Sequence, residues 1–110
     1  MYTTSQGRTP FSEWLSGLRD TQARAKIKTK LERAEAGNLG TLEGVGEGVH
    51  ELKVNYGPGY RIYFGNVNET IILLLCGGDK DAQDADIQTA RLYWKDYKRR
   101  QGNHETSTVS

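Results

Sequence analysis

The chain has 110 residues, of which 35% are hydrophobic and 26% are charged. These values are typical of one small globular domain and argue against a disordered chain. Fifteen basic residues against fourteen acidic residues leave a net charge of +1, which gives no general signal for binding to a polyanion. With one cysteine and two histidines, an intramolecular disulfide is excluded and no structural metal site is expected.

Hydropathy gives no sign of a membrane segment or of a leader. The longest apolar run, from Ile71 to Cys76, is far shorter than the ~20 residues that a bilayer-spanning helix needs. The first ten residues, MYTTSQGRTP, contain no apolar stretch of the kind found in secretory signals. We therefore expect a cytoplasmic protein without a membrane partner.

Two amphipathic helices are predicted in the first third of the chain. Thr9 and Pro10 are typical of a helix start, and Asp20 can cap a second helix. The glycine-rich segment Gly37–Gly48 lacks a phosphate-loop pattern and is interpreted as a connector. The helices should pack as a hairpin with one side on a flat surface. Their apolar residues, at helical spacing, are Phe11, Trp14, Leu15 and Leu18 in the first helix and Ala23, Ile27, Leu31 and Ala34 in the second.

Two strands joined by a turn follow the connector. Residues 49–56 and 60–65 alternate between apolar and polar side chains, which is the strand period. A three-residue loop, Gly57–Gly59, pairs Val54 with Ile62 and keeps one apolar face continuous. We therefore predict a hairpin with this register.

The opposite face of this hairpin is polar. In the predicted register Lys53 lies opposite Tyr63 and diagonal to Arg61, so the two cations are within side-chain reach of each other. Neither cation belongs to the predicted apolar core. We expect this face to lie outside the core, where its cations are either part of a site or solvated charges paired with Glu51.

The sheet is expected to contain further strands. Thr70–Cys76 is continuously apolar and reads as an interior strand covered on both faces. Asn66–Glu69 is interpreted as the turn before it, and residues 77–80 as the break that ends it. A short strand is also considered at Tyr2–Ser5, where the signal is weak.

A final helix is expected after this break. Asp79 or Asp81 can cap it, and it should run to about Arg100. Residues 101–110 are polar and are expected to form a disordered tail, which leaves 1–100 as the single domain. The predicted order is β-α-α-β-β-β-α, an α+β domain with a small, largely antiparallel sheet. The buried side of the final helix should carry Ile87, Ala90, Trp94 and Tyr97.

Three segments resemble the RelE/ParE superfamily of toxins from type II toxin–antitoxin modules, and specifically its HigB-like, phage-related branch. They are PFSEWLSGLRD (10–20), GVHELKVNYGPGYRIYF (48–64) and LLLCGGDKDAQDADIQTA (73–90). Their order and spacing carry the resemblance, which spans roughly residues 10 to 100. It implies a RelE-like fold with the helical hairpin packed on the sheet and a carboxy-terminal helix.

The resemblance also implies an activity. RelE and HigB members cut messenger RNA on the ribosome by attack of a ribose 2′-hydroxyl on the adjacent phosphate, without a metal or other cofactor. Such an endoribonuclease inhibits translation and needs a base, cations for the phosphorane and an acid. The family's cationic positions fall on Lys53, Arg61 and Lys80, which are the expected catalytic residues. Arg61, Lys80 and Gln83 are the expected RNA-binding residues.

The proton donor is where this sequence departs from the family. RelE-type enzymes often carry a catalytic tyrosine or histidine near the carboxy terminus, and here no aromatic residue follows Lys80 until Tyr93. Tyr63 is a competing acid because it shares a strand face with Lys53. Glu51 stands where several relatives have a second basic residue, and a carboxylate there would oppose the approach of RNA.

Two other functions remain open at this point. A ParE-like poison of DNA gyrase shares the fold but acts by binding, and an antitoxin-bound relic would have no catalysis. The lysine-rich side of the second helix is either a solvated face or a contact for ribosomal RNA. The expected partners are a small helix-turn-helix antitoxin, the ribosome with its messenger RNA, and operator DNA only through the antitoxin.

Overall fold

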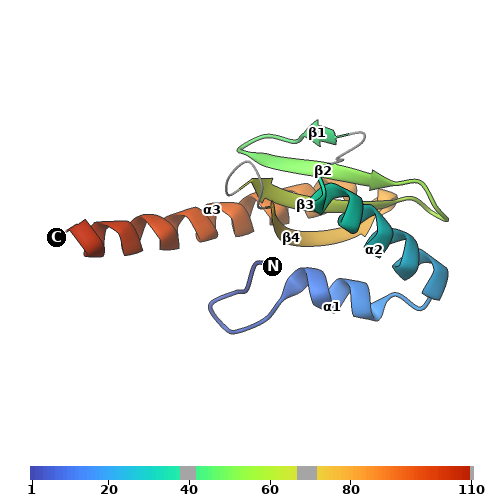
Figure 1. The fold of residues 1–110 in the computed structure, drawn as a ribbon, viewed down its shortest axis with the longest axis horizontal. Coiled ribbons are helices and arrows are strands. Elements are labelled where there is room, and N and C mark those ends of the chain that lie inside the picture. Colours follow the sequence, from blue (N-terminus) through green and yellow to red (C-terminus); the bar gives the residue numbers. More distant parts are fainter. Residues whose placement is uncertain (38–41, 67–71, 110) are drawn as a thin grey trace.

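The computed structural model describes residues 1–37, 42–66 and 72–109 and has an α+β fold. Its four strands form one antiparallel sheet in the order β1-β2-β3-β4. Helices α1 and α2 pack on one face of this sheet and α3 packs on the other (Figure 1). The elements are α1 Pro10–Gly17, α2 Thr21–Glu35, β1 Leu42–Gly44, β2 Val49–Val54, β3 Tyr60–Asn66, β4 Ile72–Asp79, the short 3-10 helix η1 Lys80–Ala82, and α3 Gln83–Val109.

The observed element order differs from the predicted one at the sheet's edges. Residues 2–5 form no strand, although the Tyr2 backbone N–H donates to the Leu74 carbonyl of β4 at 2.8 Å. The chain turns away at once, because Gly7 N–H bonds to Thr4 O. The fourth strand is instead β1, which lies inside the segment interpreted as a connector. The order is therefore α-α-β-β-β-β-α.

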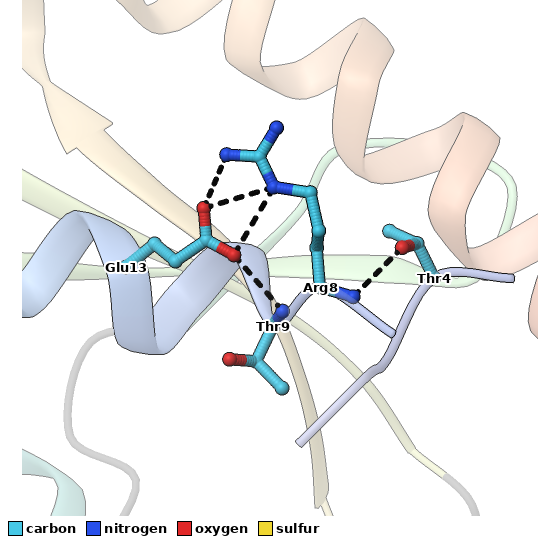
Figure 2. A network of polar contacts seen from close by, with 4 residues as sticks. All are labelled: Thr4, Arg8, Thr9 and Glu13. Atoms are coloured by element: carbon cyan, nitrogen blue, oxygen red, sulfur yellow. Dashed lines mark hydrogen bonds and ion pairs between the residues drawn. The ribbon is translucent and has the colours of Figure 1, made fainter. Parts of the chain in front are cut away.

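The start of α1 is held by side chains that the sequence analysis did not assign to this role. Thr9 occupies the cap position, but its hydroxyl makes no capping hydrogen bond. Glu13 accepts a hydrogen bond from the Thr9 backbone N–H at 3.2 Å and pairs with Arg8 (Figure 2). One of the unsatisfied amides at the helix start is thereby bonded.

Helix α2 has the cap and the buried face that were predicted. The Asp20 carboxylate accepts hydrogen bonds from the backbone of Gln22 at 3.0 Å and of Ala23 at 3.2 Å. This satisfies two of the amides that a helix leaves unbonded at its start. The α2 residues Ala23, Ile27, Leu31 and Ala34 are buried with Phe11 against Leu52, Val54, Tyr60, Ile62 and Phe64 of the sheet.

The predicted hairpin register is wrong by two residues. Val54 pairs with Tyr60, and Lys53 lies directly opposite Arg61. The connection is longer than the predicted loop because hydrogen bonds at 3.0 Å, from Tyr56 N–H to Val54 O and from Gly59 N–H to Tyr56 O, close two consecutive turns. A shift of two residues leaves every side chain on its predicted face, so the apolar side is still continuous.

The glycine pair of β4 extends the strand instead of ending it. The sequence predicted a break at residues 77–80, yet β4 continues to Asp79. A Cβ at Gly77 would overlap the Trp14 ring of α1, and a Cβ at Gly78 would overlap the Asp86 carboxylate of α3. The two glycines therefore let a helix approach each face of the sheet closely. The predicted turn at 66–69 and the start of the predicted strand lie largely outside the described residues.

Helix α3 closes the second face. It continues to Val109, beyond the end predicted at Arg100 and into the expected tail, and no proline interrupts this stretch. In Figure 1 its carboxy-terminal part projects away from the sheet. The predicted buried side is confirmed: Ala90 and Trp94 are buried, and Ile87 and Tyr97 pack against them. No helix in the described part of the chain is long and apolar enough to cross a membrane.

Candidate functional site

Polar side chains form two rows on the sheet face toward α3. Glu43, Glu51 and Tyr63 are register partners on β1, β2 and β3 and make up the first row. Lys53 and Arg61 are partners on β2 and β3 and make up the second row, which is nearer the hairpin turn. The two rows thus place carboxylates beside cations.

Each cation pairs diagonally with a carboxylate of the neighbouring strand. Lys53 Nζ lies 3.5 Å from Glu43 Oε1, and these side chains are 32% and 56% exposed. Arg61 Nε lies 3.7 Å from Glu51 Oε2, and these side chains are only 12% and 0% exposed. The expectation that this face lies outside the core is therefore wrong at Arg61, because α3 covers the inner strands.

Glu51 lies at the centre of the buried contacts. Its Oε2 accepts a hydrogen bond at 2.8 Å from Gln83 Nε2, at the start of α3. The carboxylate has no exposed surface, so it does not face an approaching RNA as the sequence suggested. Gln83 was predicted to contact RNA, and in this structure its amide donates to Glu51.

Arg61 and Lys80 come together at the end of the hairpin. The Lys80 backbone N–H donates to the Gly59 carbonyl at 2.9 Å. A Cβ placed on Gly59 would lie 3.6 Å from Arg61 Nη1 and 3.8 Å from Lys80 Cβ. The Lys80 residue is exposed. Since Lys53 is the direct partner of Arg61, the backbone positions of all three predicted cations lie at one corner of the sheet.

The predicted proton donor Tyr63 is buried beneath α3. It is 0% exposed, and its hydroxyl has no hydrogen-bond partner among the described residues. Burial, followed by the negative charges of Glu51 and Asp86, raises the pKa of Tyr63 above its ordinary value of 10.0. The alternative donor, Tyr93, stacks on Tyr2 with ring centroids 4.8 Å apart. Both candidate proton donors are therefore packed against other side chains in this conformation.

Asp86 is a half-buried polar residue that the sequence did not point to. Its Oδ2 is buried above Gly78 and has no hydrogen-bond partner in the part of the chain described. Burial first, and then the charge of Asp79, raises the pKa of the Asp86 carboxyl. The sequence signal for this contact was Gly78 itself. A glycine in a strand leaves room for a side chain of a helix that packs on it, here Asp86.

Two other reactive residue types are explained by packing. His50 stacks on Phe64 with ring centroids 5.7 Å apart, as expected for a packed histidine. Burial raises the pKa of the Cys76 thiol to about 12, so the thiol is neutral near pH 7 and is a poor nucleophile.

A separate basic surface lies on α2. Lys26 contributes to a groove of about 330 Å³ there and places its ammonium 5.3 Å from the centroid of the Tyr56 ring. This groove is on the face of the molecule opposite α3, so it is distinct from the cationic corner. Its lining residues are Ala25, Lys26, Thr29, Lys30 and Arg33.

Comparison with known proteins places the chain in a family. No family model and no solved structure matches the chain. Over 82 residues it is 45% identical to an uncharacterized protein of Haemophilus influenzae, and the match covers 74% of this chain and 83% of that protein. The chain therefore belongs to the same family as the Haemophilus influenzae protein.

Proposed function

We propose that this chain is the toxin of a type II toxin–antitoxin module, with a RelE-like fold, and that it cleaves messenger RNA on the ribosome. The observation that carries the proposal is the placement of Lys53, Arg61 and Lys80 at one corner of the sheet. Three cations whose backbone positions lie this close together suit a phosphodiester, whose charge increases in the transition state. The sequence resemblance supplies the reaction class.

In the proposed reaction the RNA supplies its own nucleophile. The 2′-oxygen forms a bond to the adjacent phosphorus and the bond to the 5′-oxygen breaks, which leaves a 2′,3′-cyclic phosphate and a 5′-hydroxyl. The ammonium of Lys53 first loses a proton to solvent, and its neutral amine then takes the proton of the 2′-hydroxyl, while Arg61 and Lys80 hold the phosphorane oxygens. Protonation of the 5′-oxygen by Tyr63 would require α3 to move, because Tyr63 is fully buried in a cluster with Ala90 and Trp94 of that helix.

The two ion pairs affect this mechanism differently. An exposed pair such as Lys53–Glu43 contributes only about 0–1 kcal/mol, so a phosphate can displace the carboxylate of Glu43. The Arg61–Glu51 pair is buried and stays together. Arg61 therefore meets the phosphate with its Nη atoms, one of which lies at Gly59.

The proposed partners follow from the proposed activity. A toxin that cuts cellular messages must be held inactive in the cytoplasm, and a helix-turn-helix antitoxin is the partner we propose. Operator DNA would then be bound by the antitoxin and not by this chain alone. Ribosomal RNA is the proposed partner of the basic surface on α2.

Induced expression with matched arginine variants tests the proposal. Wild-type protein should stop growth and translation, Arg61→Ala should abolish the arrest, and Arg19→Ala should retain it because Arg19 is exposed between α1 and α2. Primer extension on cellular transcripts should find cuts within translated codons. Growth arrest that is unchanged in Arg61→Ala would refute the assignment.

The ion pairs favour one second candidate, a binding protein without catalysis. Lys53 and Arg61 both pair with carboxylates of the chain itself, as expected where charges serve the fold. Such a protein would leave transcripts intact. Intact RNA together with DNA breaks would indicate the ParE-like action on gyrase, and intact RNA without DNA breaks would indicate an antitoxin-bound relic.

A further inference from the structure

The strongest unexplained feature is the complete burial of the Glu51 carboxylate. In the described part of the chain, Glu51 is a fully buried charged residue, whereas the other buried residues are hydrophobic. Its Oε2 accepts a hydrogen bond from Gln83, while its Oε1 has no hydrogen-bond partner among the described residues. The 3.7 Å contact of Oε2 with Arg61 Nε is an ion pair and not a hydrogen bond, because Arg61 Nε also lacks a hydrogen-bond partner in the described part of the chain. A buried ion pair is weak evidence for stability, since apolar residues often replace one without loss. The carboxylate therefore calls for another explanation.

We propose that Glu51 is a positioning residue for Arg61. It lies in the middle of β2, between two paired strands, so its backbone is held on both sides. The arginine side chain has many rotamers, and a carboxylate beside its Nε restricts them before any ligand arrives. The guanidinium then presents its Nη side at Gly59, next to Lys80. That this presentation serves phosphate binding rests on the proposed function.

Gln83 extends the same arrangement to α3. Its amide donates to the oxygen of Glu51 that also faces Arg61. The first turn of α3 and the side chain of Arg61 therefore both contact the carboxylate of Glu51. A displacement of this turn would change the surroundings of Arg61 through Glu51, without a direct contact between α3 and the phosphate.

The chain contains a matched control for this inference. Glu43 is the register partner of Glu51 on β1 and carries the same carboxylate. It also pairs with a cation of the second row, but its side chain is 56% exposed and that of its partner Lys53 is 32% exposed. Glu43 has the charge of Glu51 without its burial, so Glu43→Gln separates an effect of charge from an effect of positioning.

The orientation of Arg61 can be tested without RNA. In the full chain, NMR can follow hydrogen exchange of the Arg61 Nε–H in wild type, Glu51→Gln and Glu43→Gln. Loss of the ion pair frees the guanidinium, so this exchange should be about two- to a hundred-fold faster in Glu51→Gln. Glu43→Gln should leave it unchanged. Equal exchange in Glu51→Gln and wild type, or equal acceleration by both variants, would overturn the inference.

A second variant keeps the test decisive if Glu51→Gln does not fold. Glu51→Asp retains the charge, and partial protection of the Arg61 Nε–H relative to the exposed Arg19 supports positioning. In wild type the Arg61 signal must already exchange more slowly than that of Arg19. If the two arginines of the wild-type protein exchange equally, the inference is wrong whatever the variants do.

RNA cleavage on ribosomes then separates this inference from the proposed function. If wild type cleaves, Glu51→Gln should lower kcat more than it raises KM. If wild type does not cleave while Glu51→Gln still speeds Arg61 exchange, the positioning stands and the nuclease proposal fails. Cleavage at full rate by a folded Glu51→Gln protein would overturn the role of positioning in the reaction.

Discussion

Both faces of the sheet contain fully buried residues, but these residues are of different kinds. On the α1–α2 face, Leu52, Ile62 and Phe64 have no exposed surface and pack in an apolar cluster. On the α3 face, Glu51 and Tyr63 are as fully buried, yet one oxygen of each has no partner among the described residues. The α3 face also has an apolar cluster, which includes Leu75 and Trp94, so we attribute stability to the apolar residues of both faces. Because buried polar groups are normally satisfied, we propose a functional role for the polar rows of the α3 face.

Truncation of the apolar face should give the largest effect on stability. Ile62→Ala removes buried methyl groups that α1 and α2 cover, and it should lower the free energy of unfolding by about 2–5 kcal/mol. Chemical denaturation of the two proteins measures this difference. A loss below about 1 kcal/mol would contradict the assignment of stability to this face.

A smaller effect should come from filling the space at Gly78. In Gly78→Ala the new methyl group overlaps the Asp86 carboxylate, and overpacking of this kind costs about 1–3 kcal/mol. The double variant Gly78→Ala, Asp86→Ala should recover most of that loss, since the overlapping group is gone. Thermal and denaturant unfolding measure both variants. If the double variant does not recover stability, the close approach of Asp86 on α3 to Gly78 on β4 would be contradicted.

The smallest effect should be a pH dependence from the α3 face. The pKa of the Asp86 carboxyl is raised above its ordinary value of 3.8, so the folded state holds this proton more tightly than the unfolded chain. Its contribution to stability is full below pH 3.8 and is lost as the pH rises through the folded-state pKa. Unfolding measured across this window should show the decline in wild type and not in Asp86→Asn.

A carboxylate on the same helix controls for the loss of one charge. Asp84 is exposed, so Asp84→Asn should retain the wild-type decline. If both variants lose it equally, net charge and not the burial of Asp86 would explain the pH dependence.

Helical faces were predictable from sequence, whereas contacts between elements were not. The cap at Asp20 and the stripe ending in Ala34 depend on neighbours a few residues away, and both were confirmed. The register of β2 and β3 depends on how the turn near Gly57 closes, and alternation alone accepts any shift of two residues. The strand β1 was missed and its segment was interpreted as a connector, because three residues in a glycine-rich segment give little periodic signal.

The candidate site was predictable only in part. Strand parity placed Lys53 and Arg61 on one face, and the structure has them there as direct partners. The burial of Arg61 was missed because it depends on how α3 crosses the sheet. For the same reason Glu51 was interpreted as a surface charge, and the sequence offered no local signal of its contact with Gln83.

Cleavage of a phosphodiester at the α3 face is the central claim to test. Purified protein should be mixed with ribosomes that are translating a defined message, and the ends of any fragments should be identified chemically. We predict fragments that end in 2′,3′-cyclic phosphate within codons for wild type, and none for Arg61→Ala. An intact message with folded wild-type protein, or equal cutting by both proteins, would contradict the account.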